Sequence, residues 1–130
     1  MRLVSKEFPW QMDIQRGANT SITCENIWHG LHLMLQEPIA DSEWGMLCLP
    51  AFGGTKKREA LERAAERRRE KLRARGDHKG AKDKTLRRID FLGVDTVFRG
   101  LEKDDDYAKK RHFPTQDECE EVWIIKTAST

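Results

Sequence analysis

The stretch that most constrains the fold is the apolar segment from Leu86 to Leu101, the densest in the second half of the chain. Two short runs rich in apolar residues, 86–92 and 96–101, are separated by Gly93-Val94-Asp95. Short apolar runs are typical of strands, and glycine and aspartate are typical of a turn. The segment therefore predicts a β-hairpin around which the rest of the chain is arranged.

A chain of 130 residues predicts one domain, spanning residues 1–130. Only 38% of the residues are hydrophobic and 35% are charged, so part of the chain must lie outside the core. The formal net charge is +2, but the segment from Lys56 to Arg88 holds 15 Lys and Arg against 6 Asp and Glu. This asymmetry indicates where a polyanion or an acidic partner would make contact.

Four further segments carry strand or helix patterns. Alternation over residues 10–14 and a β-branched, aromatic run over Val122–Lys126 predict strands. Helical spacing of apolar residues predicts a helix over Glu25–Gln36, and a shorter one is expected over Ser42–Cys48. The tryptophans are all expected on inward faces of these elements: Trp10, Trp28, Trp44 and Trp123. The fold class that follows is α+β, with a small antiparallel sheet of about four strands and two helices packed on one face.

A long basic helix is predicted over Thr55–Arg75, because its residues are mostly good helix formers. Its apolar stripe is thin and is interrupted by Arg68, so the helix is expected to lie at the periphery of the domain. The polar, glycine-containing residues 77–84 that follow are predicted to be a mobile loop. Residues 55–84 are thus expected to be a basic insertion before the central hairpin.

The hairpin motif resembles a domain family of unknown function common in mushroom-forming (basidiomycete) fungi. The residues that carry the resemblance cover nearly the whole chain: Arg87-Arg88-Ile89-Asp90-Phe91-Leu92-Gly93, Val97-Phe98-Arg99-Gly100-Leu101, Pro9-Trp10, Ile22-Thr23 before the helix over 25–36, Pro38, Glu43-Trp44 and Trp123. The resemblance implies no activity and no functional residues. One departure is the segment from Gly53 to Lys84, which is longer and more basic than the short linker expected of the family.

Two histidines and one aspartate are the candidates for chemistry. His29 and His32 are three residues apart, a spacing that can place two imidazoles on one helix face as metal ligands, but no third ligand stands nearby in sequence. Asp90 lies between apolar neighbours and needs a partner if it is buried, and Arg88 or Arg99 across the hairpin could supply it. A salt bridge that fixes strand register is preferred over an anion-binding or catalytic pair. No metal, cofactor or catalytic residue is assigned.

Three function classes follow. The first is a non-enzymatic interaction module that binds a protein partner or self-associates. The alternative is a nucleic-acid-binding domain that uses the basic segment 56–88, and the third is a metal-dependent or hydrolytic enzyme using His29, His32 and Asp90. The candidate binding residues are Lys56, Lys57, Arg58, Arg67, Arg68, Arg69, Arg88, Asp90 and Arg99.

Three widely spaced cysteines and the lack of a long apolar run predict a soluble, intracellular protein with free thiols and no membrane segment.

Overall fold

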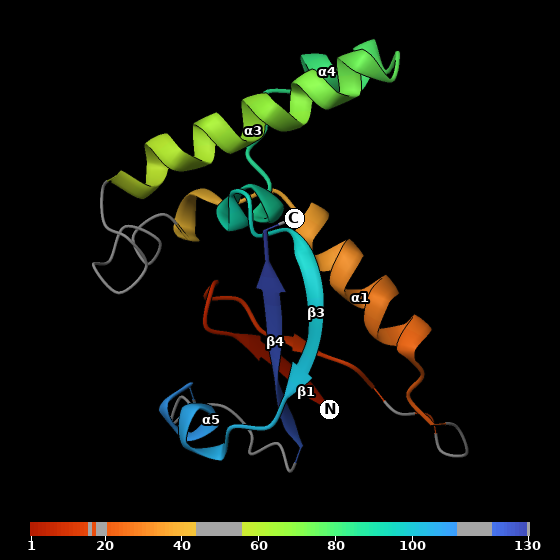
Figure 1. Cartoon of the computed structure of the whole chain (residues 1–130), viewed down its shortest axis with the longest axis vertical. Coiled ribbons are helices and arrows are strands. Elements are labelled where there is room, and N and C mark those ends of the chain that lie inside the picture. The colour runs from red at the N-terminus through yellow and green to blue at the C-terminus, as the bar shows by residue number, and fades with distance from the viewer. Residues whose placement is uncertain (16, 18–20, 44–55, 112–120, 130) are drawn as a thin grey trace.

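The computed structural model describes residues 1–15, 17, 21–43, 56–111 and 121–129. Four strands form one sheet in the order β2-β1-β4-β3. The strands span Arg2–Ser5 (β1), Met12–Asp13 (β2), Val97–Glu102 (β3) and Val122–Ala128 (β4). Helix α1, Cys24–Gln36, lies across one face of this sheet (Figure 1). The predicted α+β class is confirmed, with one departure: β1 pairs with β4 in parallel, whereas β1–β2 and β3–β4 are antiparallel.

The predicted hairpin over residues 86–101 is wrong in its first arm. Residues Arg88–Leu92 form a 3₁₀ helix, η3, and β3 pairs with β4 instead of with this segment. The cause is local: the Asp90 carboxylate accepts a hydrogen bond from the Arg87 backbone N–H at 2.9 Å, which offers the backbone an alternative to a strand ladder. Gly93, with φ of +62°, then ends the turn in a conformation that favours glycine.

Strand β1 was not predicted, although it lies between β2 and β4 inside the sheet. It has only four residues and buries three of them, so it shows no alternation. The strand predicted over 10–14 is confirmed in part as β2, and Trp10 before it is buried in the core. The last strand, β4, is confirmed and extends two residues beyond the predicted end.

Helix α1 is confirmed with Thr23 as its N-cap. The Thr23 Oγ1 accepts from the Asn26 N–H at 3.2 Å, and the Asn26 side chain accepts from the Thr23 N–H at 2.9 Å. The helix predicted over 42–48 begins instead as a 3₁₀ turn, η1, at Asp41–Glu43, and the rest of it lies outside the described residues.

Residues Lys56–Ala74 form the long helix α3. Residues 77–84, predicted to be a mobile loop, contain a short helix, α4, at His78–Lys82. The Asp77 side chain caps α4 by accepting from the Gly80 N–H at 2.8 Å, and Ala81 is buried. Helix α4 lies back along the C-terminal half of α3, so the two form a helical hairpin at one end of the molecule (Figure 1).

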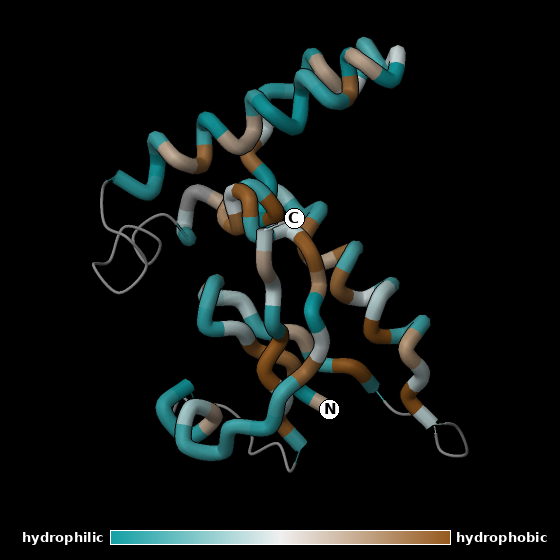
Figure 2. Tube along the Cα trace, in the orientation of Figure 1, coloured by the Kyte–Doolittle hydropathy of each residue, from teal (hydrophilic) through white to brown (hydrophobic). Residues whose placement is uncertain are grey.

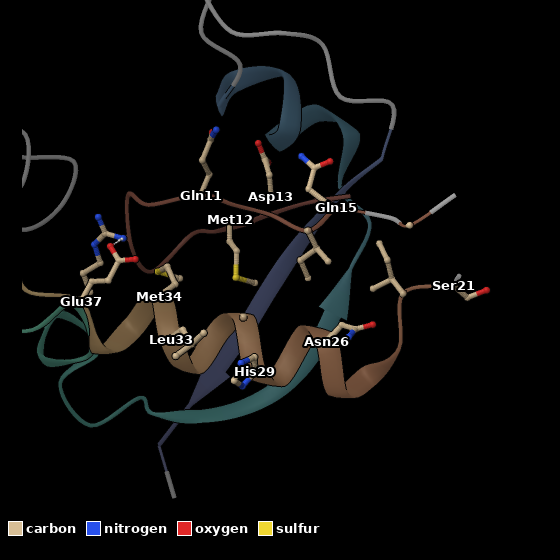
Figure 3. A pocket seen from close by; sticks show the side chains of 15 residues that line it. Gln11, Met12, Asp13, Gln15, Ser21, Asn26, His29, Leu33, Met34 and Glu37 are labelled. Atoms are coloured by element: carbon tan, nitrogen blue, oxygen red, sulfur yellow. Dashed lines mark ion pairs between the residues drawn. The ribbon is translucent and has the colours of Figure 1, made fainter. Parts of the chain in front are cut away.

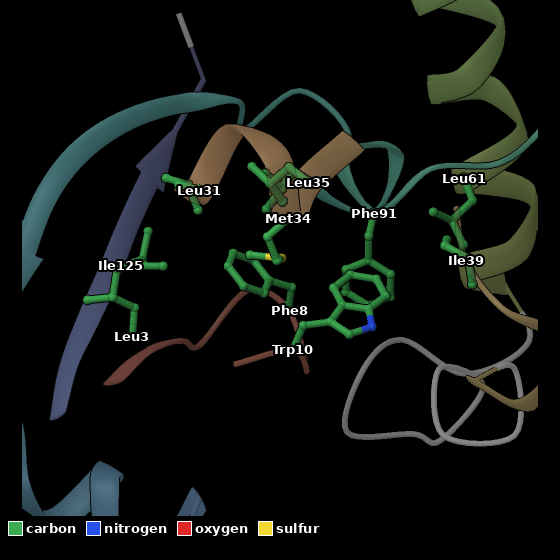
Figure 4. Close-up of a cluster of buried hydrophobic side chains, with 11 residues drawn as sticks. Leu3, Phe8, Trp10, Leu31, Met34, Leu35, Ile39, Leu61, Phe91 and Ile125 are labelled. Carbon is green, nitrogen blue, oxygen red and sulfur yellow. The ribbon is translucent and has the colours of Figure 1, made fainter. Parts of the chain in front are cut away.

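The hydrophobic core joins the sheet, α1, η3 and α3 (Figure 4). Trp10 contacts Phe91 edge-on at 5.4 Å between ring centroids, and Leu61 of α3 is fully buried. Most of α3 is hydrophilic, with a few hydrophobic positions along it (Figure 2). Of the other tryptophans, Trp28 is 55% exposed, which contradicts its predicted inward position, and Trp123 is half-buried against the core, while Trp44 lies outside the described residues.

Three consecutive aspartates, Asp104, Asp105 and Asp106, follow β3 and lead into a helix, α5, at Asp105–Arg111. The Arg111 guanidinium donates to the backbone carbonyls of Ser5, Phe8 and Pro9 at 3.1, 3.3 and 2.6 Å. The chain leaving β1 is thereby tied to α5. Among the described residues, no helix is both long enough and apolar enough to cross a membrane.

Candidate functional site

An open groove of about 640 Å³ lies between β2 and α1 (Figure 3). One wall comes from residues 11–15 and the other from residues 26–37, with Ser21 and Ile22 at one end and Arg88 at the other. Its volume falls within the ~300–1,000 Å³ range of ligand-binding clefts. We name this feature the α1–β2 groove.

Gly30 allows the two walls to approach each other. A Cβ atom at this position would lie 3.1 Å from the Met12 Sδ, closer than the ordinary contact distance. A glycine inside a helix costs about 1 kcal/mol relative to alanine, so its presence in an amphipathic helix signals a close approach of backbone to another element. This was the one signal in the sequence that could have located the groove.

Strand β2 forms one edge of the sheet and presents backbone polar groups to the groove side. The Ile14 N–H donates to the Met1 carbonyl at 2.8 Å, so the backbone groups of Ile14 and Met12 are directed at β1. Because the direction alternates along a strand, the Asp13 N–H and C=O are directed away from β1. Asp13 makes no backbone hydrogen bond to another described residue in the sheet ladder. The edge can therefore accept a further strand.

The side chains of the groove are mostly apolar or uncharged. Met12, Ile14 and Met34 form apolar surface, and Leu33, which is 53% exposed, extends it from α1. Helix α1 contributes the uncharged polar side chains Asn26 and His29, whereas Gln11, Asp13 and Gln15 point away from α1 on the opposite face of the strand (Figure 3). Such a surface suits apolar side chains flanked by peptide groups.

The carboxylate of β2 faces the other side of the sheet. Asp13 accepts two hydrogen bonds from the Arg2 guanidinium, at 2.7 and 3.0 Å. These hydrogen bonds hold the pKa of Asp13 below its ordinary value, against the opposing effect of partial burial. The pair fixes β2 to β1 and leaves the groove side of the strand uncharged.

Arg88 closes the far end of the groove. Its guanidinium pairs with Glu37 at 2.9 Å and with Glu43 at 2.9 Å, and its Cζ lies 5.1 Å from the centre of the Trp10 ring. The predicted pairing of Arg88 with Asp90 is wrong. The charge at this end is satisfied within the protein, so the groove offers no free cation to a ligand among the described residues.

Asp90 is 3% exposed and is held by Arg68 of the basic helix. Arg68 donates through Nε to Oδ1 at 2.9 Å and through Nη2 to Oδ2 at 3.0 Å. The predicted partners, Arg88 and Arg99, do not reach it: Arg99 is exposed on β3. The arginine that interrupts the apolar stripe of α3 is thus one of the residues that attach α3 to η3, beside Leu61 and Lys57.

The remaining predicted binding residues lie along α3 and do not form one site. Lys56 and Arg67 are exposed, Arg58 pairs with Glu62, and Arg69 pairs with Glu66. Lys57 is half-buried with its Nζ 4.1 Å from the centre of the Phe91 ring, and burial lowers its pKa, against the opposing effect of Glu7 and Asp95.

The predicted set of His29, His32 and Asp90 does not converge. His29 lines the groove, His32 is exposed outside it, and Asp90 is enclosed between η3 and α3. Within the described part of the chain, no group of three His, Cys, Asp or Glu residues is placed to hold a metal ion.

Searches of curated proteins and of solved structures each found no match. A model of a family of unknown function (DUF6699) matches residues 1–110, a range that includes both walls of the α1–β2 groove, the α3–α4 hairpin, η3 and β3. The match covers well over half of the chain, and the chain therefore belongs to this family of unknown function.

Proposed function

We propose that the protein is a non-enzymatic interaction module that binds an extended peptide in the α1–β2 groove. The peptide adds to the edge of β2 as a further strand, and its side chains on one face enter the groove. The observation that carries this proposal is the outward direction of the Asp13 backbone groups beside an apolar cleft. Strand addition of this kind obtains affinity from main-chain hydrogen bonds and specificity from pockets for alternate side chains.

The groove chemistry favours an uncharged partner segment with apolar residues at every second position. Met12 and Leu33 would contact those side chains, and Gln11 and Gln15, on the opposite face of β2, would lie beside the polar ones. A charged residue at an inward position would lose its hydration without gaining a partner, since Arg88 is already paired with Glu37. We therefore expect charged peptides to be excluded.

The other edge of the sheet is less suited to strand addition. Strand β3 has a register irregularity between Phe98 and Gly100, and the exposed Arg99 lies at that point. Bulges and charges at an edge are common devices that prevent pairing with another chain.

Selection from a random peptide library displayed on phage tests the proposal. The expected result is enrichment of sequences with alternating apolar residues and few charges, which are then synthesised and their dissociation constants measured by fluorescence polarisation. Asp13→Pro removes the outward N–H, while Asp13→Ala loses the same contact with Arg2 but keeps the N–H. Asp13→Pro should weaken binding by about tenfold or more relative to Asp13→Ala, the value of one hydrogen bond or slightly more.

Two results would overturn this function. One is that no sequence is enriched over a library control without the protein. The other is that the enriched peptides bind Asp13→Pro and Asp13→Ala equally well.

A second candidate function is nucleic-acid binding through the segment 56–88. The observation that favours it is a set of exposed cations with no acidic side-chain partner among the described residues: Lys56, Arg63, Arg67, Lys71, Arg75, Lys79, Lys82 and Lys84. Clustered cations bind phosphate backbones by releasing counterions, so the affinity should fall steeply with salt. Titration of the protein with DNA and RNA at several salt concentrations tests this candidate, and a lack of binding at low salt would contradict it.

A further inference from the structure

A second cavity, of about 340 Å³, lies between α3 and α4, far from the α1–β2 groove. Four cationic side chains line it, together with one carboxylate and one histidine: Arg69, Arg73, Lys82, Lys84, Glu66 and His78. We name this cavity the α3–α4 pocket. Only Arg69 of this set was among the predicted binding residues.

The single carboxylate of the pocket orients the two arginines by hydrogen bonds, but it cannot neutralise all four cationic side chains of the pocket. Glu66 accepts from Arg69 Nε at 3.0 Å and Nη2 at 2.7 Å, and from Arg73 Nη1 at 3.0 Å. The hydrogen bonds from Arg69 and Arg73 hold the pKa of Glu66 below its ordinary value, so it remains a carboxylate. Each guanidinium has five N–H donors and keeps some of them for another acceptor.

The two lysines lie on the α4 side of the pocket. Lys82 and Lys84 are exposed and make no ion pair with a described residue. The α4 helix is held beside α3 by the buried Ala81 and by the Asp77 cap. The pocket is thus a concave surface with two oriented guanidiniums on one side and two free ammonium groups on the other.

We propose that the α3–α4 pocket seats a backbone phosphate of a nucleic acid, an inference that rests on the nucleic-acid candidate function. Guanidinium groups match phosphate oxygens in paired hydrogen bonds, and lysines add point charges. Exposed Lys71, Arg75 and Lys79 lie outside the pocket, on the same two helices and their connection, and add to the positive potential of this end of the molecule. This surrounding charge favours a polyanion over an isolated phosphate ion.

The composition of the α3–α4 helical hairpin predicts that the protein binds nucleic acid without preference for a base sequence. Residues 56–84 contain no Phe, Tyr or Trp, so the imidazole of His78 is the one aromatic ring that this segment offers for base stacking. Phosphate contacts position a protein on nucleic acid but do not themselves select a sequence.

The test is fluorescence anisotropy with labelled single-stranded DNA, duplex DNA and RNA of about 20 nucleotides, at salt concentrations from about 50 to 300 mM. The test variant is K82E/K84E. The matched control is K109E/K110E, which makes the same change in net charge on exposed lysines of α5, at the other end of the molecule. Circular dichroism verifies that both variants are folded.

The expected result is that K82E/K84E reduces affinity at low salt by at least about tenfold and lowers the slope of log affinity against log salt by about two. The control should change affinity less than about threefold, through long-range charge alone. Arg73→Gln, which leaves Arg69 on Glu66, should produce a smaller loss than K82E/K84E in the same direction.

Each other outcome has a definite meaning. If the wild-type protein binds no probe at low salt, the nucleic-acid candidate fails, and this inference fails with it. If it binds but both double variants weaken equally, nucleic-acid binding stands and the pocket assignment is overturned. A strong preference for one base sequence, or tighter binding to anionic lipid vesicles than to any nucleic acid, would also overturn the proposed backbone contact.

Discussion

Replacing Arg68 by methionine should destabilise the protein far more than its position on a charged, peripheral helix suggests. The Asp90 carboxylate would remain buried with one backbone donor, the Arg87 N–H. Removing one partner of a buried ion pair costs ~3–5 kcal/mol. We expect a value near the lower end, about 3 kcal/mol, because the Arg68 side chain is 20% exposed and water can reach part of the site.

The assay is urea unfolding at neutral pH, followed by circular dichroism and tryptophan fluorescence. Arg67→Met is the matched control, since Arg67 is the exposed neighbour, and its effect should stay within about 0.5 kcal/mol. The double-mutant cycle with Asp90→Asn isolates the pair, because the amide no longer leaves a charge buried. In that background Arg68→Met should cost only about 1 kcal/mol, which gives a coupling of about 2 kcal/mol.

Two results would refute this account of how α3 is attached. The first is a loss for Arg68→Met that matches the loss for Arg67→Met. The second is an unchanged cost of Arg68→Met in the Asp90→Asn background, which would show that the arginine acts through packing alone.

Three further predictions concern other contacts. Gly30→Ala should stabilise the protein by up to about 0.5–1 kcal/mol, because helix propensity improves and the flexible Met12 side chain can move. Gly30→Val should destabilise the protein instead. Thermal unfolding of both variants gives the sign of each change. The lowered pKa of Asp13 contributes stability that is present above pH ~4 and is lost as the pH falls through the folded pKa. The difference in unfolding free energy between wild type and Asp13→Asn should therefore shrink in acid titrations. A constant difference down to pH ~2 would contradict the pairing with Arg2. Arg111→Met should cost about 2–3 kcal/mol in urea unfolding, since three backbone carbonyls lose a charged donor, and a change below about 0.5 kcal/mol would mean that this contact does not hold α5 in solution.

The elements that could be predicted are those whose signals are local. Helix α1 has a threonine cap and helical spacing, α3 is built of helix formers, and β4 is a β-branched run. Strand β1 could not be predicted because a four-residue inner strand buries nearly every side chain and has no period. The residues of the 3₁₀ turn η3 alternate in sequence like a strand, and only the hydrogen bond from the Arg87 backbone N–H to the Asp90 carboxylate separates the two possibilities.

The candidate sites were harder to predict because they arise from contacts between distant segments. The α1–β2 groove joins residues near 12 with residues near 30, and only the glycine in α1 hinted at this approach. The basic charge of residues 56–88 was visible in the sequence, but the sequence did not show which of these cations are paired inside the protein and which are exposed. Arg68 and Arg88 are used inside the protein, whereas Lys82 and Lys84 are left on the surface beside the paired arginines of α3.

The measurement that tests the proposed function most directly is amide hydrogen exchange of β2 with and without a library-selected peptide. The Asp13 N–H, directed away from β1, should exchange more slowly when the peptide is bound, because it then donates to the added strand. The Ile14 N–H, already bonded to the Met1 carbonyl, should change much less. An Asp13 amide that exchanges at the same rate while the protein is saturated with peptide would contradict strand addition at this edge.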